Sequence, residues 1–414
     1  VVTAIVVVAA PLLAVPLAYG FTDEPAKFEL FIEMFRITFP YLMLVSLTAF
    51  CGSILNSYDR FAIPALTPAL LNVSLITSAV FLSPYMSTPE LALAWGVLIA
   101  GVGQLLFQLP FLVQIRLLPR PKTGKFHEGV QRVKTLMIPA LFGVSVSQIN
   151  LLLDTFIASL LVSSSVSWLY FSDRLMELPL GIFGIAIATV VLPSLSRKHA
   201  EASLDDFGQT LDWAFRLVCL IAVPATLALM VIAEPLLVTL FQNDNFSATD
   251  VIRVTSSLQA YAFGLIAFMA IKIFAPGFYA RQDTKTPVRI GIIAMCTNMV
   301  LNILLVFVLD LAYVGLALAT SLAAFVNAGL LFAGLWRDGV YHFHSGWLRF
   351  MLRIIVANAC MAVFLIFYAG DWQDWLQWSG WQRVAQLGIL TVGGLAIYLV
   401  ALFGTGMRLR HVTR

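Results

Sequence analysis

The stretch YFSDRLMELPLGIFGIAIATVVLPSL, residues 170–195, combines three charges with a long apolar run. Asp173, Arg174 and Glu177 fall within five residues of one another, and the residues after Glu177 are uncharged and mostly apolar. A run of this length approaches the ~20 residues that an α-helix needs to cross a ~30 Å hydrocarbon core. The stretch therefore predicts a membrane-spanning helix with a charged cluster at one end.

The whole chain has a similar composition. Of its 414 residues, 60% are hydrophobic and 11% are charged, and the mean hydropathy is +0.91. A soluble domain cannot bury so much apolar surface, so the composition indicates an all-α polytopic membrane protein. The apolar runs are too long and too uniform for barrel strands, which alternate. Twelve predicted spans lie near residues 1–18, 36–56, 62–83, 91–115, 135–161, 166–195, 210–232, 252–279, 288–309, 314–335, 348–369 and 384–406.

Basic residues gather on one side of these predicted spans. When alternate loops are assigned to two sides, 18 of the 25 Lys and Arg residues share the side of the C-terminal tail. The positive-inside rule makes that side cytoplasmic. The other side carries DWQDWLQWSGW (371–381), a tryptophan-rich segment that suits a membrane interface. Membrane topology thus explains the basic residues, and no nucleic-acid partner is expected.

Signatures of enzymes and of resident metals are missing from the sequence. KTGKFH (122–127) ends like a phosphate-binding loop but lacks the earlier Gly and the Ser or Thr after Lys125. The five His residues lie in predicted loops or tails, without the spacing of metal ligands. The four Cys residues lie in predicted helices and show no disulfide framework. We expect no catalytic residues and no cofactor, with Na⁺ as the one candidate ion.

Two parts of the chain resemble each other at an offset of about 220 residues. Residues 40–72 and 260–298 each contain a long apolar helix ending in an aromatic residue and an Arg, then a Pro-containing turn and a second helix with Asn. Residues 92–116 resemble residues 313–337 at nearly the same offset. Both copies run inward at their first helix, which indicates a parallel repeat, as in transporters with two pseudo-symmetric lobes.

The repeat predicts the domain organisation. We expect a partial first lobe of four helices (1–118), a basic cytoplasmic linker (119–134), a second lobe of six helices (135–338), and two extra helices with a basic tail (339–414). Two helices precede the repeated part of the second lobe. We therefore expect the natural chain to start about 85 residues before Val1, with two more helices in the first lobe.

Ionisable residues inside predicted spans are the main candidates for function. A charge at the bilayer centre costs ~2.5–3.5 kcal/mol on insertion scales, so it usually marks a pathway or a paired site. Asp173, Arg174 and Glu177 can lie close together on one helix because they are three or four residues apart. They form either a functional cluster or an interfacial Arg that snorkels to the surface beside its neighbours. Lys272 falls near the midplane, where a cavity between the lobes is the favoured explanation.

A second candidate site consists of polar residues at a similar predicted depth. Asp154, Asn302 and Thr320 lie ~20–30 Å from the cytoplasmic ends of their helices, and Asn298 is one turn from Asn302. Four oxygen ligands at one depth could hold a small hard cation such as Na⁺. The alternative is hydrogen bonding between helices, which Asn and Thr make routinely.

Three segments closely resemble the MviN/MurJ family of lipid II flippases, whose superfamily includes multidrug/cation antiporters and oligosaccharide-lipid exporters. They are SVSWLYFSDRLMELPLGIFGIAIATVVLPSLS (165–196), APGFYARQDTKTPV (275–288) and ILNSYDRFAIPALTPALLN (54–72). The resemblance extends over essentially the whole chain, except that the family's first two helices have no counterpart in it.

The resemblance implies fourteen helices in two six-helix lobes plus two C-terminal helices. It implies transport of lipid II, the undecaprenyl-pyrophosphate-linked peptidoglycan precursor, to the outer leaflet of the bacterial inner membrane. A cationic cavity between the lobes would take the headgroup, and a groove at the last two helices would take the lipid tail. The family's cavity Arg matches Arg174, and its sodium site matches Asp154, Asn298, Asn302 and Thr320.

Other functions remain open at this stage. A cation-coupled drug antiporter or another polyprenyl-linked oligosaccharide flippase could share the fold. A membrane-embedded lipid enzyme would need a catalytic dyad or His cluster within the membrane, which the sequence lacks. A scaffold in the cell-wall synthesis machinery would leave the intramembrane charges without a role. The expected partners are lipid II and membrane lipids, with the cell-wall machinery as a further candidate.

Overall fold

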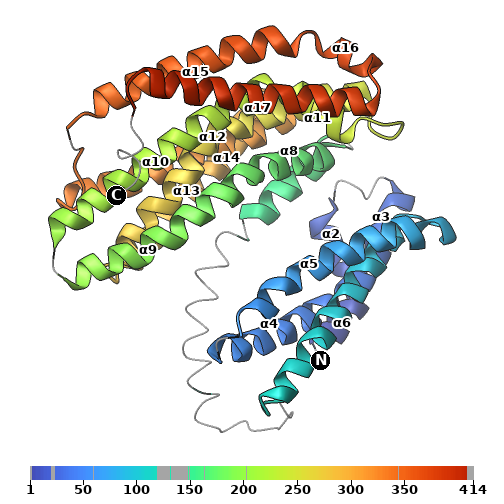
Figure 1. The fold of residues 1–414 in the computed structure, drawn as a ribbon. Coiled ribbons are helices and arrows are strands. Elements are labelled where there is room, and N and C mark those ends of the chain that lie inside the picture. The colour runs from blue at the N-terminus through green and yellow to red at the C-terminus, as the bar shows by residue number, and fades with distance from the viewer. Residues whose placement is uncertain are drawn as a thin grey trace. The chain divides into compact units, whose positions relative to one another are not determined.

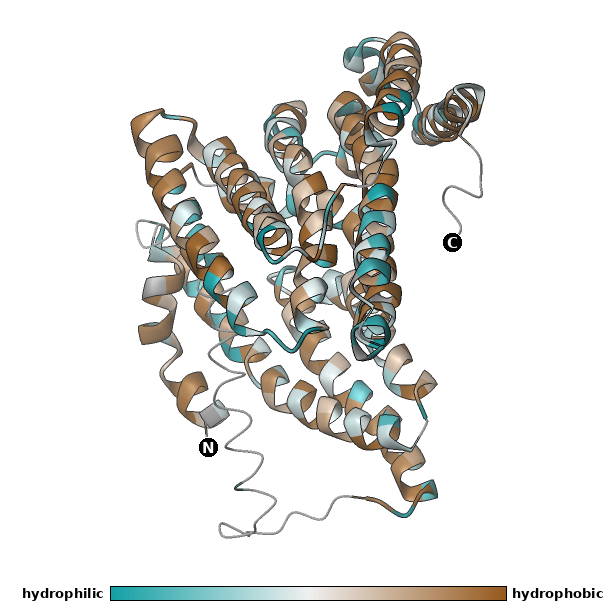
Figure 2. Ribbon diagram, turned by 90° about the vertical axis from the view of Figure 1, so that its left-hand side faces the viewer, coloured by the Kyte–Doolittle hydropathy of each residue, from teal (hydrophilic) through white to brown (hydrophobic). Residues whose placement is uncertain are grey.

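A computed structural model describes residues 2–19, 24–58, 60–118, 131, 148, 150–162, 164–201, 203–343 and 345–407. Nearly all regular structure in these ranges is helical, apart from an isolated bridge between Asn243 and Phe246 (Figure 1). Ten of the described helices are long and apolar enough to cross a membrane. Figure 2 shows hydrophobic residues along most of their length. The prediction of an all-α polytopic membrane protein is confirmed.

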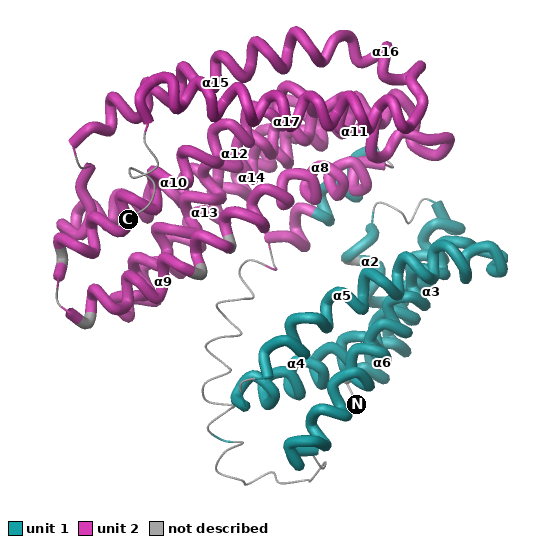
Figure 3. The backbone as a smooth tube through the Cα atoms, in the orientation of Figure 1, with its two compact units in different colours: residues 1–140, 155–163 teal, residues 141–154, 164–414 magenta. Residues whose placement is uncertain are grey.

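Two compact units make up the chain (Figure 3). Unit 1 comprises Val1–Ala140 and Thr155–Ser163, and unit 2 comprises Leu141–Asp154 and Ser164–Arg414. The short apolar helix Asn150–Ser159 contributes to both units. The predicted linker 119–134 lies, apart from residue 131, outside the described residues, and the predicted boundary at residue 338 stays a prediction.

Among the described residues up to 118, the helices of unit 1 form four apolar segments. Its elements are α1 (Val2–Val8), α2 (Ala10–Leu17), α3 (Pro25–Thr38), α4 (Tyr41–Ser57), α5 (Ala62–Thr77), the π-helical turn η2 (Ser78–Leu82), the 3₁₀ turn η3 (Ser83–Tyr85) and α6 (Leu91–Gln114). The four segments are α1 with α2, α3 with α4, α5 with the turns after it, and α6. Helices α4 and α5 both pack against α6. Buried Gln104 and Gln108 of α6 bond to Thr67 of α5, so polar side chains as well as apolar ones hold this unit together.

Unit 2 holds the remaining helices and the C-terminal hairpin. Its elements are α8 (Ser165–Pro179), the π-helical turn η4 (Leu180–Gly184), α9 (Ile185–Ala200), α10 (Leu204–Val231), α11 (Ala233–Phe241), α12 (Ala248–Tyr279), α13 (Lys285–Asn302), the π-helical turn η5 (Ile303–Val308), α14 (Ala312–Arg337), α15 (Trp347–Ala369), α16 (Trp372–Gln377) and α17 (Gly380–Gly404). Helix α12 is central, because α8, α9, α10, α11 and α14 all pack against it.

Helices α12 and α14 pack closely against each other in this core. A Cβ atom added at Gly264 would lie 2.5 Å from Ser321 Oγ, so only Gly permits this spacing. The Ser321 hydroxyl donates to the Ala260 carbonyl at 2.7 Å, which joins the two helices by a hydrogen bond inside the apolar core.

Ten of the twelve predicted spans correspond to long helices in the structure. The predicted span 1–18 forms the two short helices α1 and α2, with Pro11 in the first turn of α2. The predicted span 135–161 lies mostly outside the described residues, and its described end forms the helix Asn150–Ser159. The count of twelve therefore stays a prediction.

The structure corrects one boundary. The span predicted at 36–56 is the end of a longer helical segment, Pro25–Ser57, in which α3 precedes α4. Helix α3 carries Lys27, Glu29, Glu33 and Arg36, which break the apolar pattern. Charges of this kind interrupt an apolar run but do not prevent a helix, so the helical segment already begins at Pro25.

The π-helical turns recur at related positions in the two units. Turn η2 directly follows α5 and turn η5 directly follows α13, about 225 residues later, close to the repeat offset. Turn η4 follows Pro179, whose missing N–H group interrupts the helical hydrogen bonds. π-Helical turns of this kind are frequent at functional sites, and η4 and η5 both lie directly beside predicted site residues.

Candidate functional site

One face of α8 packs against α12, and this packing determines which way the charged side chains of α8 point. Trp168, Ser172, Leu175, Met176 and Pro179 are buried, at the spacing of one helix face. The Trp168 Nε1 group donates to Asp250 Oδ1 at 2.8 Å, and the Ser172 hydroxyl lies 2.5 Å from the Ser257 hydroxyl of α12 in a shared hydrogen bond. Because this face packs against α12, the opposite face of α8 (the open face) is more exposed.

The predicted charged cluster lies on that open face. Arg174 Nη1 lies 2.7 Å from Glu177 Oε2, and the two side chains are 57% and 47% exposed. The guanidinium also lies over the Tyr170 ring, with Cζ 5.1 Å from the ring centroid. Asp173 is half-buried and interacts electrostatically with both Arg174 and Glu177. The arrangement is an oriented, accessible guanidinium with acidic neighbours, which is suited to meeting an anion.

The second predicted cluster is brought together inside unit 2. Asn302 Nδ2 donates to Asp154 Oδ1 at 2.6 Å and to Asn298 Oδ1 at 3.0 Å. Asn298 Nδ2 in turn donates to Thr320 Oγ1 at 3.3 Å. Asn298 and Asn302 are buried. Asn298 and Asn302 are neighbours on α13, and the tertiary fold brings Asp154 of the helix Asn150–Ser159 and Thr320 of α14 to them.

The amides of this cluster can satisfy more than one arrangement. When the Asn298 amide is turned over, its nitrogen meets Asn150 Oδ1 at 3.0 Å and its oxygen accepts from Thr320. Its nitrogen then also lies 3.0 Å from Asn302 Nδ2, so the Asn302 amide would have to turn as well. In the unturned arrangement Asn302 Oδ1 is buried and has no hydrogen-bond donor. A buried oxygen without a donor is costly and is available to a ligand.

The side-chain oxygens of this cluster are suitable donors for a small cation. Turning the Asn302 amide alone would direct its oxygen toward Asp154 Oδ1 and Asn298 Oδ1, where its nitrogen now lies 2.6 and 3.0 Å away. Three converging oxygens, one of them from a carboxylate, are the donors that hard cations prefer. Among the described residues no group of three His, Cys, Asp or Glu side chains could hold a transition metal.

A cavity of about 400 Å³ in unit 2 borders this cluster. Asn150, Asn298 and Thr320 line it, together with Asn327 and residues of α12 and α13. Small side chains such as Gly291 and Ala294 leave the space. The cavity can hold water beside the polar cluster, because the amide and hydroxyl groups on its wall provide hydrogen-bond partners.

Lys272 joins neither cluster in the structure. It is exposed on α12, and within the described ranges no hydrogen bond or ion pair of its side chain is found. Phe268 and Ile271 of the same helix line the 400 Å³ cavity, but Lys272 does not. Its assignment to a substrate site stays a prediction.

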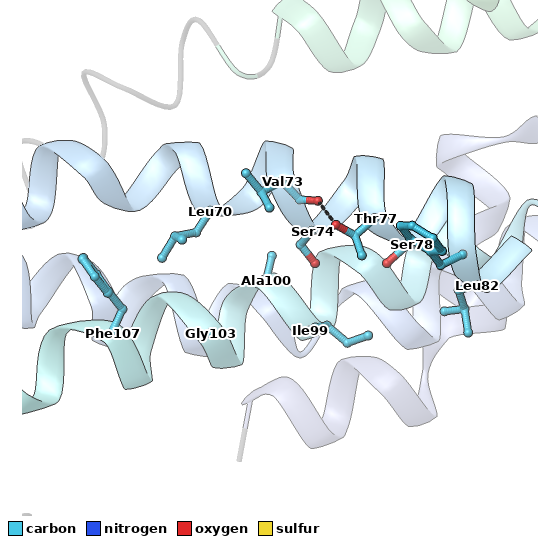
Figure 4. Close-up of a pocket in the computed structure, with 11 residues that line it drawn as sticks. Leu70, Val73, Ser74, Thr77, Ser78, Leu82, Ile99, Ala100, Gly103 and Phe107 are labelled. Carbon is cyan, nitrogen blue, oxygen red and sulfur yellow. Dashed lines mark hydrogen bonds between the residues drawn. The ribbon is translucent and has the colours of Figure 1, made fainter.

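Unit 1 contains a cavity of a different kind, about 560 Å³ in volume (Figure 4). It lies between α5 with η2 on one side and α6 on the other, and most of its lining is apolar. The Ser74 hydroxyl donates to the Gly96 carbonyl and the Thr77 hydroxyl to the Val73 carbonyl, both at 2.7 Å. With these hydroxyls already bonded, the cavity fits an apolar chain rather than an anionic headgroup.

Asn150 and Tyr170 complete the two clusters and are not among the predicted residues. Asn150 donates to Asp154 Oδ2 at 3.2 Å, and Tyr170 lies beneath Arg174. Each stands four residues before its partner, the spacing that makes side chains neighbours on a helix. That spacing was the signal in the sequence from which both could have been found.

Ten candidate spans and ionisable side chains within them define the class of a polytopic membrane transporter. Residues 1–385 match the family model described as lipid II flippase MurJ. The chain is 51% identical to a probable lipid II flippase MurJ of Vibrio cholerae, covering 93% of this chain and 73% of that protein. It is 45% identical to a probable lipid II flippase MurJ of Haemophilus influenzae, covering 100% of this chain and 83% of that protein.

Solved structures agree with these relatives at the level of the fold. A structure of lipid II flippase MurJ in an inward closed conformation superposes with a TM-score of 0.78 at 23% identity, covering 97% of this chain and 79% of that one. An inward-facing multidrug resistance MATE family transporter of the MOP superfamily gives 0.66 at 14% identity, covering 82% and 79%. The chain belongs to the lipid II flippase MurJ family.

Proposed function

We propose that this protein transfers lipid II from the cytoplasmic to the outer leaflet of the bacterial inner membrane by alternating access. The substrate follows from the family and from the names of its relatives, and the transfer needs no covalent chemistry on the lipid. In this proposal the protein is a multi-pass inner-membrane protein with a cytoplasmic C-terminus, as the positive-inside rule predicts.

The observation that carries the proposal is the accessible Arg174 on the open face of α8. Lipid II carries a pyrophosphate, and a guanidinium can form two parallel charge-assisted hydrogen bonds with such a group. Tyr170 supports the guanidinium from one side and Glu177 pairs with it from the other. Glu177 and Asp173 would compete with the pyrophosphate for Arg174, which orients it before binding and favours release afterwards. Lys272 would add positive charge for the headgroup.

Na⁺ is the proposed coupling ion at Asp154, Asn298, Asn302 and Thr320. Support comes from the convergence of the four side chains and from the Asn302 amide, which leaves Oδ1 unpaired as it stands and, when turned, directs it toward Asp154 Oδ1 and Asn298 Oδ1. A bound cation would supply positive charge that Asp154 and the amide oxygens then neutralise. The chain's own residues provide the site; water in the adjoining 400 Å³ cavity could hydrate the ion as it leaves.

Reconstituted transport tests this function. The full-length protein in liposomes should move fluorescent lipid II across the bilayer, and Arg174→Ala should do so about 10- to 100-fold more slowly. Arg197→Ala is the matched control, because Arg197 is exposed at the far end of the same helical segment and should leave transport unchanged. Movement of a cationic drug instead of lipid II would identify a drug antiporter on this fold.

The cation is tested separately. Transport should increase when Na⁺ replaces a large organic cation, and Asp154→Asn should remove that increase while protein yield and thermal stability remain near the wild-type values. An Na⁺ response that survives Asp154→Asn would leave the cluster with a purely structural role as hydrogen bonding between helices.

A further inference from the structure

The C-terminal hairpin of α15 and α17 is attached to the rest of unit 2 at three heights. Helix α15 packs against α10, and α16 and α17 pack against α11. Most exposed residues on the hairpin's outer side are apolar, as expected for contact with lipid. Polar anchors, in contrast, occur at each end of the hairpin and also between its ends, and each involves α10, α11 or the turn that follows α11.

The first anchor lies where α15 begins. Trp347 Nε1 donates to Asp212 Oδ1 at 2.6 Å, and Tyr341 donates to the same oxygen at 3.1 Å. Arg216 Nε donates to Asp212 Oδ2 at 2.8 Å. The Arg216 guanidinium lies over the rings of Trp347 and Phe350, with centroid distances of 5.3 and 5.6 Å. The start of the hairpin is thus tied to α10 by a buried carboxylate and a stacked cation.

The second anchor lies at the opposite end, where α17 begins. Arg383 Nη1 donates to Gln242 Oε1 at 2.7 Å and to the Val238 carbonyl at 3.4 Å. The same side chain donates to the carbonyls of Trp378 at 3.1 Å and Leu376 at 3.0 Å. One guanidinium therefore joins the turn of the hairpin to α11 and to the turn after it.

The third anchor lies within α17 and replaces a backbone hydrogen bond that is missing from α10. Residue 224 is Pro, so the Leu220 carbonyl, four residues earlier, has no helical N–H partner. The Tyr398 hydroxyl of α17 donates to that carbonyl at 2.8 Å, and Tyr398 is 3% exposed. An unpaired carbonyl in the hydrocarbon is costly, so this bond fixes the position of α17 against α10.

We propose that the hairpin keeps its place on unit 2 throughout the transport cycle, with Tyr398 as the positioning residue within the membrane. This inference rests on the proposed alternating access. The hairpin therefore moves together with the Arg174 cluster of unit 2, and the two keep a constant separation while the protein changes conformation.

Distances between spin labels test the inference in a background without the four native cysteines. One pair joins exposed Ile252 of α12 to exposed Val392 of α17, within unit 2. The reference pair joins Ile252 to exposed Tyr85 of unit 1. Addition of lipid II or Na⁺ should change the reference distance and leave the Ile252–Val392 distance unchanged. A change in the Ile252–Val392 distance as large as that in the reference pair would overturn the proposal.

A double-mutant cycle tests the role of Tyr398 independently of transport. Tyr398→Phe should broaden the Ile252–Val392 distances and lower the melting temperature, whereas Tyr368→Phe, which removes an exposed hydroxyl of α15, should do neither. Pro224→Ala restores the missing N–H, so the thermal cost of Tyr398→Phe should largely disappear in that background. Equal costs in both backgrounds, or unchanged distance widths in Tyr398→Phe, would refute the anchor. If the Ile252–Tyr85 distance does not change, alternating access is contradicted but the anchor is not. The double-mutant cycle still tests the role of Tyr398.

Discussion

In the described part of unit 2, two arginine–carboxylate pairs each lie within a single helix, and their surroundings differ. Arg174 and Glu177 are three residues apart, 2.7 Å from each other, and 57% and 47% exposed. Arg216 and Asp212 are four residues apart, 2.8 Å from each other, and only 25% and 8% exposed. Asp212 also accepts from Tyr341 and Trp347, so the second pair is part of a closed network.

The difference shows which pair is available to a ligand. Partners around Asp212 satisfy both of its oxygens, and the rings of Trp347 and Phe350 cover Arg216. Arg174 pairs with Glu177, lies over Tyr170 and has Asp173 beside it, all on its own helix, and more than half of its side chain is exposed. Local sequence spacing makes the two pairs look alike, and their burial separates an enclosed pair from one that a ligand can reach.

The largest effect is expected on stability, when the enclosed Asp212–Arg216 pair is broken. Asp212→Ala should lower the free energy of unfolding by about 3 kcal/mol, because it leaves Arg216 without its buried counter-charge. Thermal unfolding in detergent measures this. Asp205→Asn, an exposed change near the start of the same helix, is the control and should stay within about 0.5 kcal/mol of the wild type. Equal stability of both variants would contradict the structural role of Asp212.

Removing the open cation comes next. Arg174→Ala should slow lipid II transport about 10- to 100-fold, because a hydrogen bond to a charged group contributes about 1.5–3 kcal/mol. Its melting temperature should match that of the wild type, since α8 is held by Trp168 and Ser172 on its other face. Wild-type transport by a well-folded variant would assign Arg174 to the membrane interface instead.

A smaller loss of transport is expected when residue 174 keeps its positive charge but its side chain has a different shape. Arg174→Lys retains the cation but cannot form two parallel bonds with a phosphate, so transport should fall by about tenfold or less. The comparison with Arg174→Ala in the same liposome assay separates charge from geometry. If Lys and Ala lower transport equally, the two-pronged contact is the essential feature; if Lys matches Arg, charge alone suffices.

The smallest effect is expected at the exposed partner. Glu177→Gln removes an accessible ion pair, which contributes about 0.2–1 kcal/mol, so transport should change less than about fivefold. We expect tighter retention of lipid II, measured as slower release from the purified protein, because Glu177 no longer competes for Arg174. Faster release would mean that Glu177 holds Arg174 in place more than it competes with the substrate.

Some site residues could be identified from sequence because their partners are near in the chain. The Arg174–Glu177 pair follows from their spacing on one helix, and the structure places them 2.7 Å apart. The residues alone predicted the polar cluster of Asp154, Asn302 and Thr320 only by similar depth, since depth does not specify which helix faces which. The assignment of the set of four, with Asn298, to one sodium site came from the resemblance to the family. Asp154 and Asn302 lie 148 residues apart in the chain and 2.6 Å apart in space.

The sequence by itself determined the class, the long apolar helices and the cluster on α8, because membrane insertion and helix periodicity depend on residues that are close in the chain. Only the tertiary structure decided which charges are open and which are closed. Arg216 is another cation within a predicted span (210–232), yet Trp347 and Tyr341, more than 120 residues away, enclose its partner. Likewise, Pro224 predicts a break in α10, but only the packing of α17 shows that Tyr398 repairs it. Such contacts depend on how separate helices pack, which local pattern does not encode.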